Sequence, residues 1–313
     1  MKKFAFVFPG QGSQTVGMMQ AWEGNAASDK VLRLANEALN EDLTGLIANG
    51  PVEQLNLTTF TQPAMLAASV AMFEAWQAAG GPQASVMAGH SLGEYAALTA
   101  AGAMDLQDAV RAVRVRADAM QAAVPVGTGA MAAILGLEDD AVLAVCQQSA
   151  QSEVVEAVNF NAPAQVVIAG HVDAVERAME AAKQAGAKRA VRLPVSAPFH
   201  SSLLRPAAVV LQDALNKIDI QAPKVSVIHN VDVQTHQSPD AIRQALVDQA
   251  WHPVRWTQTI EAMASQGVTH IVECGPGKVL SGLVRRINRD LVGLSVNDPQ
   301  SMQKAIDVLR EEA

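Results

Sequence analysis

Residues 87–95 read Met-Ala-Gly-His-Ser-Leu-Gly-Glu-Tyr, and the interpretation of the whole chain starts from this stretch. A short apolar run at 85–88 leads into it, and the alanine-rich sequence from Leu92 onward is typical of a helix. A strand, a sharp turn and a helix with Gly-x-Ser-x-Gly at the turn form a nucleophile-elbow pattern. Ser91 is therefore a candidate nucleophile. A turn whose glycines serve packing alone is the alternative.

Two backbone N–H groups near this turn are candidates for stabilising an oxyanion. Leu92 follows the candidate nucleophile at the start of a helix, where its N–H is free to donate. The expected first strand, Phe4–Phe8, runs into a glycine turn at 9–14. Because neither Gly-x-Gly-x-x-Gly nor Gly-Lys-Ser/Thr follows, that turn is better suited to lending an N–H to a site than to binding a nucleotide.

The bulk composition excludes several classes of protein. With 313 residues, of which 50% are hydrophobic, the chain is long enough for a large core. A net charge of -8 argues against broad nucleic-acid binding, and the apolar runs are too short for a membrane span. Cys146 and Cys274 indicate neither a disulfide framework nor a cysteine metal site. We therefore expect a cytoplasmic protein without a secretory signal.

The order of expected strands and helices predicts an α/β protein in two parts. Strand–helix alternation in residues 1–125 and 197–313 predicts a hydrolase-like large domain with a mainly parallel sheet. Residues 126–196 follow the order β-α-β-β-α-β, which predicts an inserted ferredoxin-like subdomain. The strands of this subdomain are expected at 131–137, 154–158, 165–169 and 188–193.

Three further segments bear on the site. The turn-rich sequence 159–163 is expected to link two strands of the subdomain. One helix is expected to begin at Pro63, and another, Leu106–Ala123, carries several arginines. Of these arginines, Arg111 and Arg114 are expected to be solvated.

A serine nucleophile needs a general base, and seven histidines are available. His90 lies inside the turn, where its ring cannot easily reach the hydroxyl of the next residue. His200 is the best candidate, because it lies in a mixed polar and apolar loop directly after the subdomain returns to the large domain. No residue stands out as the acid of a Ser-His-Asp triad.

Several motifs together make the chain resemble the malonyl-CoA:acyl-carrier-protein transacylase family, and it is also similar to the acyltransferase domains of polyketide synthases. The motifs match in order over nearly the whole chain. They are Phe-Pro-Gly-Gln-Gly-Ser-Gln (8–14), Thr-Gln-Pro-Ala (61–64), Gly-His-Ser-Leu-Gly-Glu-Tyr (89–95), Asn-Phe-Asn-Ala-Pro-Ala-Gln-Val-Val-Ile-Ala-Gly (159–170), Ala-Pro-Phe-His-Ser (197–201), His-Pro-Val-Arg-Trp (252–256) and Glu-Cys-Gly-Pro-Gly (273–277).

The resemblance implies a role for each matching residue. Ser91 is expected to be the acylated nucleophile and His200 its general base. Arg116 is expected to hold the malonyl carboxylate. The resemblance further implies an oxyanion hole from the backbone N–H groups of Gln11 and Leu92, orientation of His200 by the backbone carbonyl of Gln249, and a site lined by Gln62 and Asn161. Ala162 and His252 depart from the residues common in the family, but neither is a proposed chemical group.

The resemblance also implies a reaction and a partner. Malonyl is expected to pass from malonyl-CoA to Ser91 and then to the phosphopantetheine thiol of acyl carrier protein, for fatty-acid biosynthesis. We expect a monomer with no metal and no bound cofactor. Because the family's carrier protein is acidic and this chain is acidic overall, docking requires a local basic patch. The candidates are Lys188, Arg189, Arg192, Arg285 and Arg286, for which scattered surface charge is an equally good interpretation.

Three other functions stay open at this point. A serine esterase or thioesterase would share the nucleophile but use water as the acceptor. The possible carboxylate partner, Arg116, and the missing triad acid argue against it. A carrier-protein-docking module with an inactive site would not need Ser91, His200, Arg116 and Gln11 together. A loader of branched extender units is disfavoured because Phe199 before His200 resembles the malonyl-selective pattern.

Overall fold

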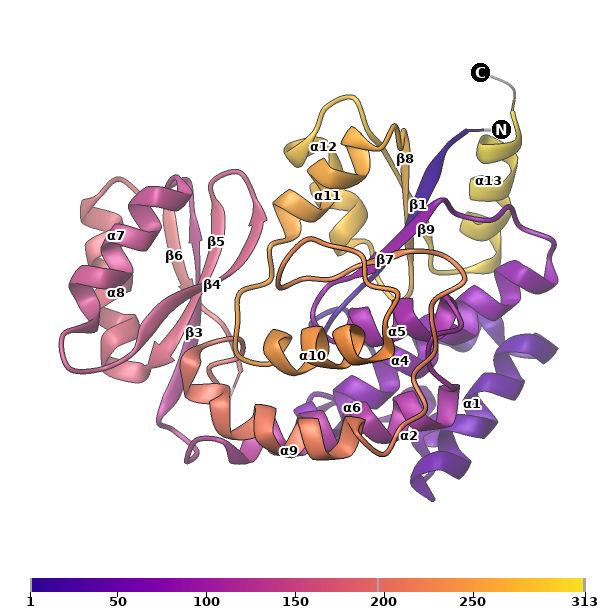
Figure 1. The fold of residues 1–313 in the computed structure, drawn as a ribbon, viewed down its shortest axis with the longest axis horizontal. Coiled ribbons are helices and arrows are strands. Elements are labelled where there is room, and N and C mark those ends of the chain that lie inside the picture. The colour runs from indigo at the N-terminus through magenta and orange to yellow at the C-terminus, as the bar shows by residue number, and fades with distance from the viewer. Residues whose placement is uncertain (1, 196, 312–313) are drawn as a thin grey trace.

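Two β-sheets organise the chain, which the computed structural model describes over residues 2–195 and 197–311. The first is parallel and has the strand order β7-β2-β1-β8-β9 (Figure 1). Because all pairs are parallel, the carboxyl ends of β1, β2 and β7 meet at one edge of the sheet. Its strands are β1 (Phe4–Phe8), β2 (Val86–Gly89), β7 (Val227–Ile228), β8 (His270–Cys274) and β9 (Val292–Val296).

The central strand β1 is buried on both faces, which explains its unbroken apolar sequence. Phe4, Phe6 and Phe8 point into one core cluster, and Phe6 makes edge-on ring contacts with Phe73 and Trp76 of the long helix α4 (Thr58–Ala78). The intervening residues Ala5 and Val7 belong to a second cluster on the opposite face. The sheet therefore lies in the middle of the core.

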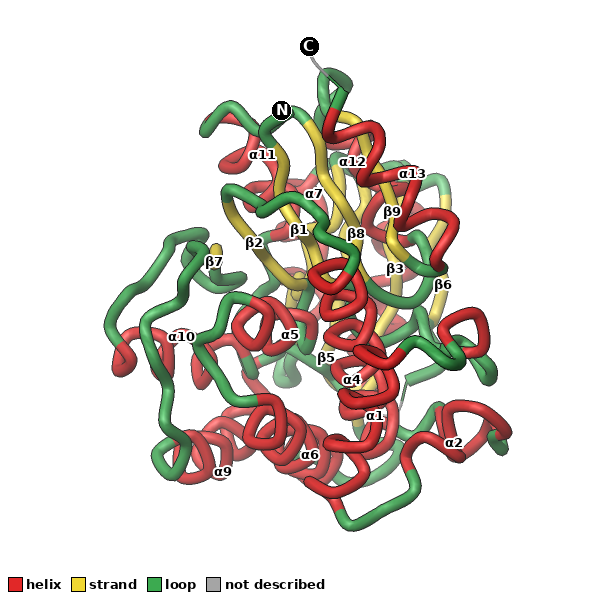
Figure 2. Tube along the Cα trace, turned by 90° about the vertical axis from the view of Figure 1, so that its right-hand side faces the viewer, coloured by secondary structure: helices red, strands yellow, loops and turns green. Residues whose placement is uncertain are grey.

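Helices cover both faces of the parallel sheet. The larger core cluster includes residues of α4, α5 and α13, whereas α11 and α12 contribute to the other. Figure 2 shows α1, α4 and α6 packed side by side. The remaining bounds are α1 (Ala26–Leu39), α2 (Leu43–Asn49), α3 (Val52–Leu55), α5 (Gly93–Ala100), α6 (Leu106–Ala122), α9 (Arg205–Leu215), α10 (Pro239–Gln249), α11 (Trp256–Ser265), α12 (Val279–Ile287) and α13 (Pro299–Arg310), with short 3-10 helices at Gln20–Trp22 and Ser202–Leu204.

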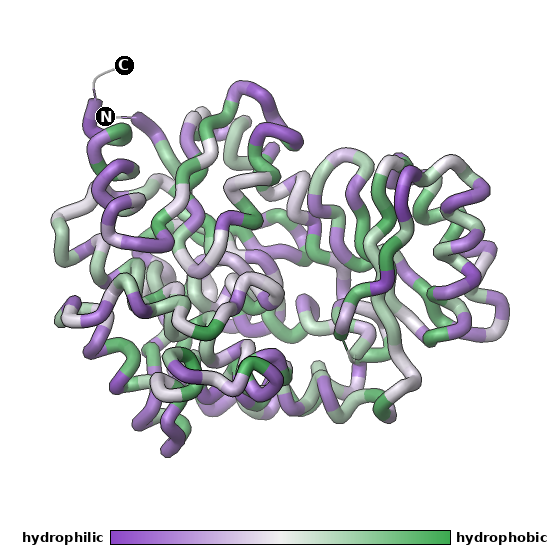
Figure 3. The backbone as a smooth tube through the Cα atoms, turned by 180° about the vertical axis from the view of Figure 1, so that it is seen from behind, coloured by the Kyte–Doolittle hydropathy of each residue, from purple (hydrophilic) through white to green (hydrophobic). Residues whose placement is uncertain are grey.

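The second sheet is antiparallel and has the order β4-β5-β3-β6. Along the chain its elements run β3-α7-β4-β5-α8-β6, the order expected from the sequence. Figure 3 shows hydrophilic and hydrophobic turns alternating along the helices that flank this sheet. The expected domain limit at residue 196 lies outside the described residues. The element bounds are β3 (Gly129–Leu135), α7 (Asp139–Ala150), β4 (Val155–Ala162), β5 (Gln165–His171), α8 (Val172–Gln184) and β6 (Arg189–Arg192).

Residues 159–161 form part of a strand, so the prediction of a turn-rich link there was wrong. Strand β4 continues to Ala162, and its pairing with β5 shifts register twice, between Ala157 and Asn159 and between Phe160 and Ala162. Such irregularities bend a strand and redirect its side chains. Asn159 also bridges to Val254 outside the sheet. The bend places Asn159 and Asn161 beside the edge where β1 and β2 end.

The helix α4 begins at Thr58, before Pro63 rather than at it. A proline inside a helix has no N–H for the carbonyl four residues earlier, here Thr59. Arg114 of α6 replaces that donor, because its Nε lies 3.0 Å from the Thr59 carbonyl oxygen. Its guanidinium also forms two hydrogen bonds with Glu41, of 2.6 and 2.7 Å. Arg114 is therefore largely buried in a tertiary contact, and the expectation that it is solvated was wrong.

None of the helices within 2–195 and 197–311 combines the length and hydropathy needed to cross a bilayer. No group of three or more His, Cys, Asp or Glu side chains in the same ranges is arranged to hold a metal ion.

Candidate active site

Ser91 lies at the turn between β2 and α5, at the carboxyl end of the parallel sheet. Its φ of 55° is in the left-handed region, which a non-glycine residue adopts only when its surroundings enforce it. A Cβ on Gly89 would lie 1.9 Å from the backbone of Gly93, and a Cβ on Gly93 would lie 2.2 Å from the Phe8 carbonyl oxygen. Both glycines are therefore required by the close approach of strand, turn and helix, and Ser91 projects from the turn.

His200 is the histidine that reaches Ser91. The Nε2 atom of His200 lies 2.7 Å from the Ser91 hydroxyl oxygen, and Nδ1 lies 2.8 Å from the backbone carbonyl oxygen of Gln249. A carbonyl can only accept, so Nδ1 carries the hydrogen and Nε2 is left to accept the serine proton. His200 is buried and has a φ of 65°, so its backbone is held in the left-handed region as well.

The surroundings of His200 keep its ring neutral. Burial and then the positive charge of Arg116 lower the pKa of His200 to about 3, and the hydrogen bond to Gln249 opposes this shift only in part. A neutral imidazole at neutral pH is the form that can accept a proton from serine.

Arg116 extends from α6 into the same site and is 2% exposed. It donates from Nη1 to the Gln62 side-chain oxygen at 2.7 Å, and from Nη2 to Ser91 Oγ at 3.1 Å and to the Gln249 side-chain oxygen at 2.9 Å. Burial lowers the pKa of the Arg116 guanidinium from its ordinary value, and the Tyr95 and Glu94 side chains oppose that shift. The site therefore contains a buried guanidinium within reach of whatever is bound to Ser91.

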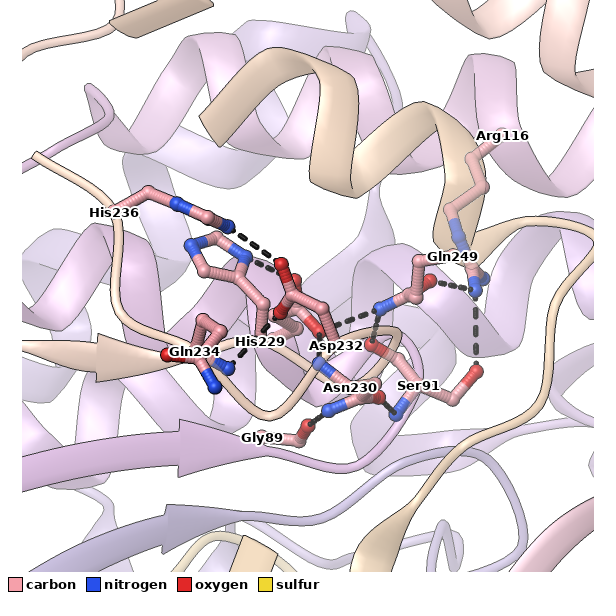
Figure 4. A network of polar contacts seen from close by, with 10 residues as sticks. Gly89, Ser91, Arg116, His229, Asn230, Asp232, Gln234, His236 and Gln249 are labelled. Carbon is pink, nitrogen blue, oxygen red and sulfur yellow. Dashed lines mark hydrogen bonds and ion pairs between the residues drawn. The ribbon is translucent and has the colours of Figure 1, made fainter. Parts of the chain in front are cut away.

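Gln249 and Asn230 support this site through side chains that the sequence analysis did not identify. The Gln249 amide nitrogen donates to the Ser91 carbonyl oxygen at 2.8 Å, and Asn230 Oδ1 accepts from the Ser91 N–H at 2.8 Å. Figure 4 shows both side chains converging on Ser91. Strand β7 ends at Ile228, and Asn230 lies two residues later. In the sheet, β7 is the neighbour of β2. That position, the carboxyl end of a neighbouring parallel strand, was the signal available for Asn230.

A cavity of about 200 Å³ opens at Ser91. Gln11 and Leu92 line it, and among the described residues, 2–195 and 197–311, no hydrogen bond to the backbone N–H of either is found. Asn161 also lines it and accepts a 2.8 Å hydrogen bond from His90 Nε2. The structure thus brings together all eight predicted site residues. Seven of them line this cavity, and Gln249 contacts three of those seven. The other lining residues are Gln62, His90, Ser91, Arg116, Met131, Asn159, Val167, Leu193, Val195, Phe199 and His200.

The basic residues considered for docking are all exposed and lie on two elements. Lys188, Arg189 and Arg192 lie on or beside β6, where Arg192 pairs with Glu176 at 2.9 Å. Arg285 and Arg286 lie in the last turn of α12, and Arg286 donates to the Gln165 side chain at 2.7 Å.

Comparison with known proteins identifies the family. Residues 5–302 match the model of the acyl transferase domain. The malonyl CoA-acyl carrier protein transacylase of Escherichia coli (strain K12) is 53% identical over 98% of this chain and 100% of that protein. The chain belongs to the malonyl CoA-acyl carrier protein transacylase family. The family resemblance inferred from the motifs is therefore confirmed.

Solved structures of the family have the same fold. An acyl-carrier-protein S-malonyltransferase from Burkholderia pseudomallei 1710b is 59% identical and superimposes with a TM-score of 0.96, covering 97% of this chain and 99% of that one. A malonyl-transacylase in complex with a type II PKS acyl-carrier protein is 49% identical, with a TM-score of 0.97 over 98% of this chain and 100% of that one. Both match the arrangement of a parallel and an antiparallel sheet.

Proposed function

We propose that this chain is an acyltransferase that moves malonyl from malonyl-CoA to the phosphopantetheine thiol of an acyl carrier protein, through a malonyl-Ser91 intermediate in fatty-acid biosynthesis. The observation that carries the chemistry is the convergence of Ser91, His200 and Arg116 within hydrogen-bonding distance. The names of the relatives support the substrate and the acceptor.

The first half-reaction acylates Ser91. His200 Nε2 takes the hydroxyl proton while Ser91 Oγ attacks the thioester carbon of malonyl-CoA. The carbon–sulfur bond breaks, and the protonated His200 gives its proton to the departing thiolate of coenzyme A. Gln249 orients the ring throughout, because its carbonyl accepts from Nδ1.

The backbone N–H groups of Gln11 and Leu92 are proposed to stabilise the oxyanion of each tetrahedral intermediate. Both residues line the cavity at Ser91, and Leu92 stands at the start of α5, where the helix dipole favours negative charge. The loop after β1 and the turn after β2 are neighbours because these two strands pair in parallel.

Arg116 is proposed to select malonyl by binding its free carboxylate with charge-assisted hydrogen bonds. Gln62 accepts from Nη1 of the guanidinium and Gln249 accepts from Nη2, and Asn161 lines the same cavity. An acetyl group has no carboxylate and would leave this buried cation without an anionic partner. A hydrogen bond to a charged group contributes about 1.5–3 kcal/mol, which corresponds to a preference of about 10- to 100-fold.

The second half-reaction reverses the first with a different thiol. His200 takes the proton of the phosphopantetheine thiol, the sulfur attacks the acyl carbon, and the Ser91 Oγ–carbon bond breaks as Ser91 recovers a proton. Because one thioester replaces another, the overall transfer is nearly balanced in free energy. The exposed basic residues on and beside β6 and in the last turn of α12 are proposed to contact the acidic carrier protein.

We also propose that the two sheets correspond to two domains. Residues 1–125 and 197–313 would form a hydrolase-like domain around the parallel sheet, and 126–196 a ferredoxin-like subdomain. The element order β3-α7-β4-β5-α8-β6 and the strand order β4-β5-β3-β6 support the second assignment.

Intact mass measured shortly after mixing with malonyl-CoA tests the function. We expect a gain of one malonyl group on Ser91, none in Ser91→Ala, and release that is faster with carrier protein than with water. An unmodified enzyme that simply hydrolyses malonyl-CoA would favour the esterase. Neither an adduct nor hydrolysis would favour a docking module.

A further inference from the structure

Arg116 is a buried cation with no direct anionic partner among the residues that the structure describes. Its hydrogen-bond acceptors within residues 2–195 and 197–311 are the neutral side chains of Gln62, Ser91 and Gln249. Burying a charge without a counter-charge is costly, and proteins usually place an opposite charge nearby. The source of that counter-charge in the unacylated enzyme is not explained by the acyl-transfer chemistry.

Glu94 is the carboxylate closest to Arg116 along the hydrogen-bond network. It is 0% exposed, and its Oε2 accepts from the Gln249 amide nitrogen at 3.1 Å. The oxygen of the same amide accepts from Arg116 at 2.9 Å, so one glutamine side chain joins the two charges. Figure 4 shows Gln249 reaching Arg116 on one side, with Ser91 beside it.

The other contacts of Glu94 suit an anion. Its Oε1 lies 2.7 Å from His229 Nδ1, and Oε2 also accepts from the Asn230 N–H at 2.9 Å. Among the described residues, the buried Nε2 of His229 has no partner. A hydrogen on that nitrogen would be a buried donor without an acceptor, so the geometry favours a single ring hydrogen on Nδ1, donated to Glu94.

We propose that Glu94 is a positioning residue that acts through Gln249 as the resident counter-charge of Arg116, and thereby weakens the hold of Arg116 on the malonyl group. The proposal rests on the function proposed above. A carboxylate in direct contact with Arg116 would occupy the donors that the substrate needs. A carboxylate that acts through the Gln249 amide stabilises the cation without occupying its donors. The Arg116 Nε, for example, has no partner among the described residues.

The direction of the effect follows from electrostatics. The malonyl carboxylate and Glu94 both attract Arg116 and repel each other. Removing the charge of Glu94 makes malonyl the main anionic partner of Arg116, so the malonyl-enzyme becomes more stable relative to the free enzyme. In the wild type, Glu94 therefore makes the malonyl-enzyme less stable relative to the free enzyme, which favours transfer of malonyl to the next thiol. An acetyl group has no charge, so its equilibrium does not respond to Glu94.

Glu94→Gln isolates the charge, because the amide oxygen can still accept from Gln249 and Asn230. The new NH2 would face His229, whose ring would have to carry its hydrogen on the unpartnered Nε2 instead of Nδ1. That cost is the same in free and acylated enzyme, so it cancels in both equilibrium constants. The measurement is the fraction of acylated enzyme, by intact mass, at fixed ratios of malonyl-CoA to coenzyme A, repeated with acetyl-CoA.

We expect Glu94→Gln to raise the malonyl equilibrium constant about tenfold and to leave the acetyl constant unchanged within about twofold. A lower malonyl constant, or equal changes for both acyl groups, would overturn the proposal, because a structural role affects both substrates alike. Failure of wild-type enzyme to form any malonyl-Ser91 would instead overturn the proposed function.

Two further variants complete the test. Asp232→Asn removes a partly exposed charge from the loop after Asn230, where Asp232 pairs with His236 at 2.7 Å, and should leave both constants unchanged. A tenfold effect there would show a general field and contradict the proposal. Glu94→Asp keeps the charge and decides the matter if Glu94→Gln does not fold. Its ratio of malonyl to acetyl constants should match wild type, and a ratio about tenfold higher would contradict the proposal.

Discussion

The backbone carbonyl oxygen of Gln249 accepts the Nδ1 hydrogen of His200 at 2.8 Å, the position at which many serine hydrolases have a carboxylate. A neutral acceptor orients the ring as well as a carboxylate does. It stabilises the protonated ring less, because it adds no negative charge. Burial and Arg116 lower the pKa of His200, and this neutral acceptor opposes the shift only in part, so His200 is a base that stays unprotonated over a wide pH range.

Acylation of Ser91 should keep its rate as the pH falls below about 6.5, the ordinary pKa of histidine. The reason is that burial and Arg116 lower the pKa of His200 to about 3. Rapid mixing with malonyl-CoA at several pH values, with the adduct quantified by mass, measures this rate. Half-loss of the rate near pH 6.5 would contradict the shifted pKa.

The same shift predicts a pH dependence of stability. Because the pKa of His200 is lower in the folded state than in the unfolded state, its contribution is complete above about pH 6.5 and is lost as the pH falls toward the folded pKa. His200→Gln should therefore lose less unfolding free energy than wild type over this range. Urea unfolding at each pH measures the difference, and parallel losses in the two proteins would count against it.

Arg116→Ala should lower the rate of Ser91 malonylation by about 10- to 100-fold while acetylation changes little, because only malonyl offers a carboxylate. Acylation rates from malonyl-CoA and acetyl-CoA, compared in the same protein, measure this preference. The control is Arg111→Ala, which removes an exposed arginine of the same helix that pairs with Asp108. Equal losses on both substrates would remove Arg116 from the selective role.

Gly89→Ala should destabilise the fold by about 2–3 kcal/mol or more, because its Cβ would lie 1.9 Å from the backbone of Gly93. Gly282→Ala is the matched control, since it is exposed in helix α12 and its Cβ would have no heavy atom within 4 Å. It should stabilise by about 0.5–1 kcal/mol. Urea unfolding of both variants gives these free energies, and similar values would refute the packing argument.

Charge reversal at Lys188 and Arg189 should raise the KM for carrier protein without changing that for malonyl-CoA, because only the protein partner is proposed to contact β6. Steady-state kinetics with each substrate varied in turn measure both constants. Arg33→Glu, at an exposed position of helix α1, controls for a change in overall charge. An unchanged KM for carrier protein would exclude this surface from docking.

Local sequence patterns predicted the parts of this molecule whose structure depends on neighbouring residues. The buried strand Phe4–Phe8 has the expected bounds, and the turn at Ser91 follows from its glycines. The motifs of the family supplied the proposed role of Arg116, which no local pattern specifies, and supported that of His200, which its position in the loop had already indicated.

Contacts between distant segments could not be predicted in this way. Arg114 donates to the Thr59 carbonyl and so replaces the hydrogen bond that Pro63 cannot make within α4. No sequence pattern near Pro63 predicts this contact. Glu94 contacts Asn230 and Gln249, which are more than a hundred residues away in the sequence. Such contacts depend on where β7 and α10 lie relative to α5, and that placement is a property of the whole fold.

The Arg114 contact has a consequence for engineering the specificity of this pocket. Gln62 of α4 and Arg116 of α6 form a hydrogen bond within the site. Between the same two helices Arg114 binds Thr59, and it also binds Glu41 in the loop between α1 and α2. The Arg114–Thr59 contact and the Gln62–Arg116 contact therefore both join α4 to α6. A designer who transplants α6 alone would carry over the Arg116 guanidinium without the Gln62 side chain that binds it. The transferable unit is the helix pair with its proline, and a substitution at the partly exposed Glu41 is a way to retune the pocket from outside.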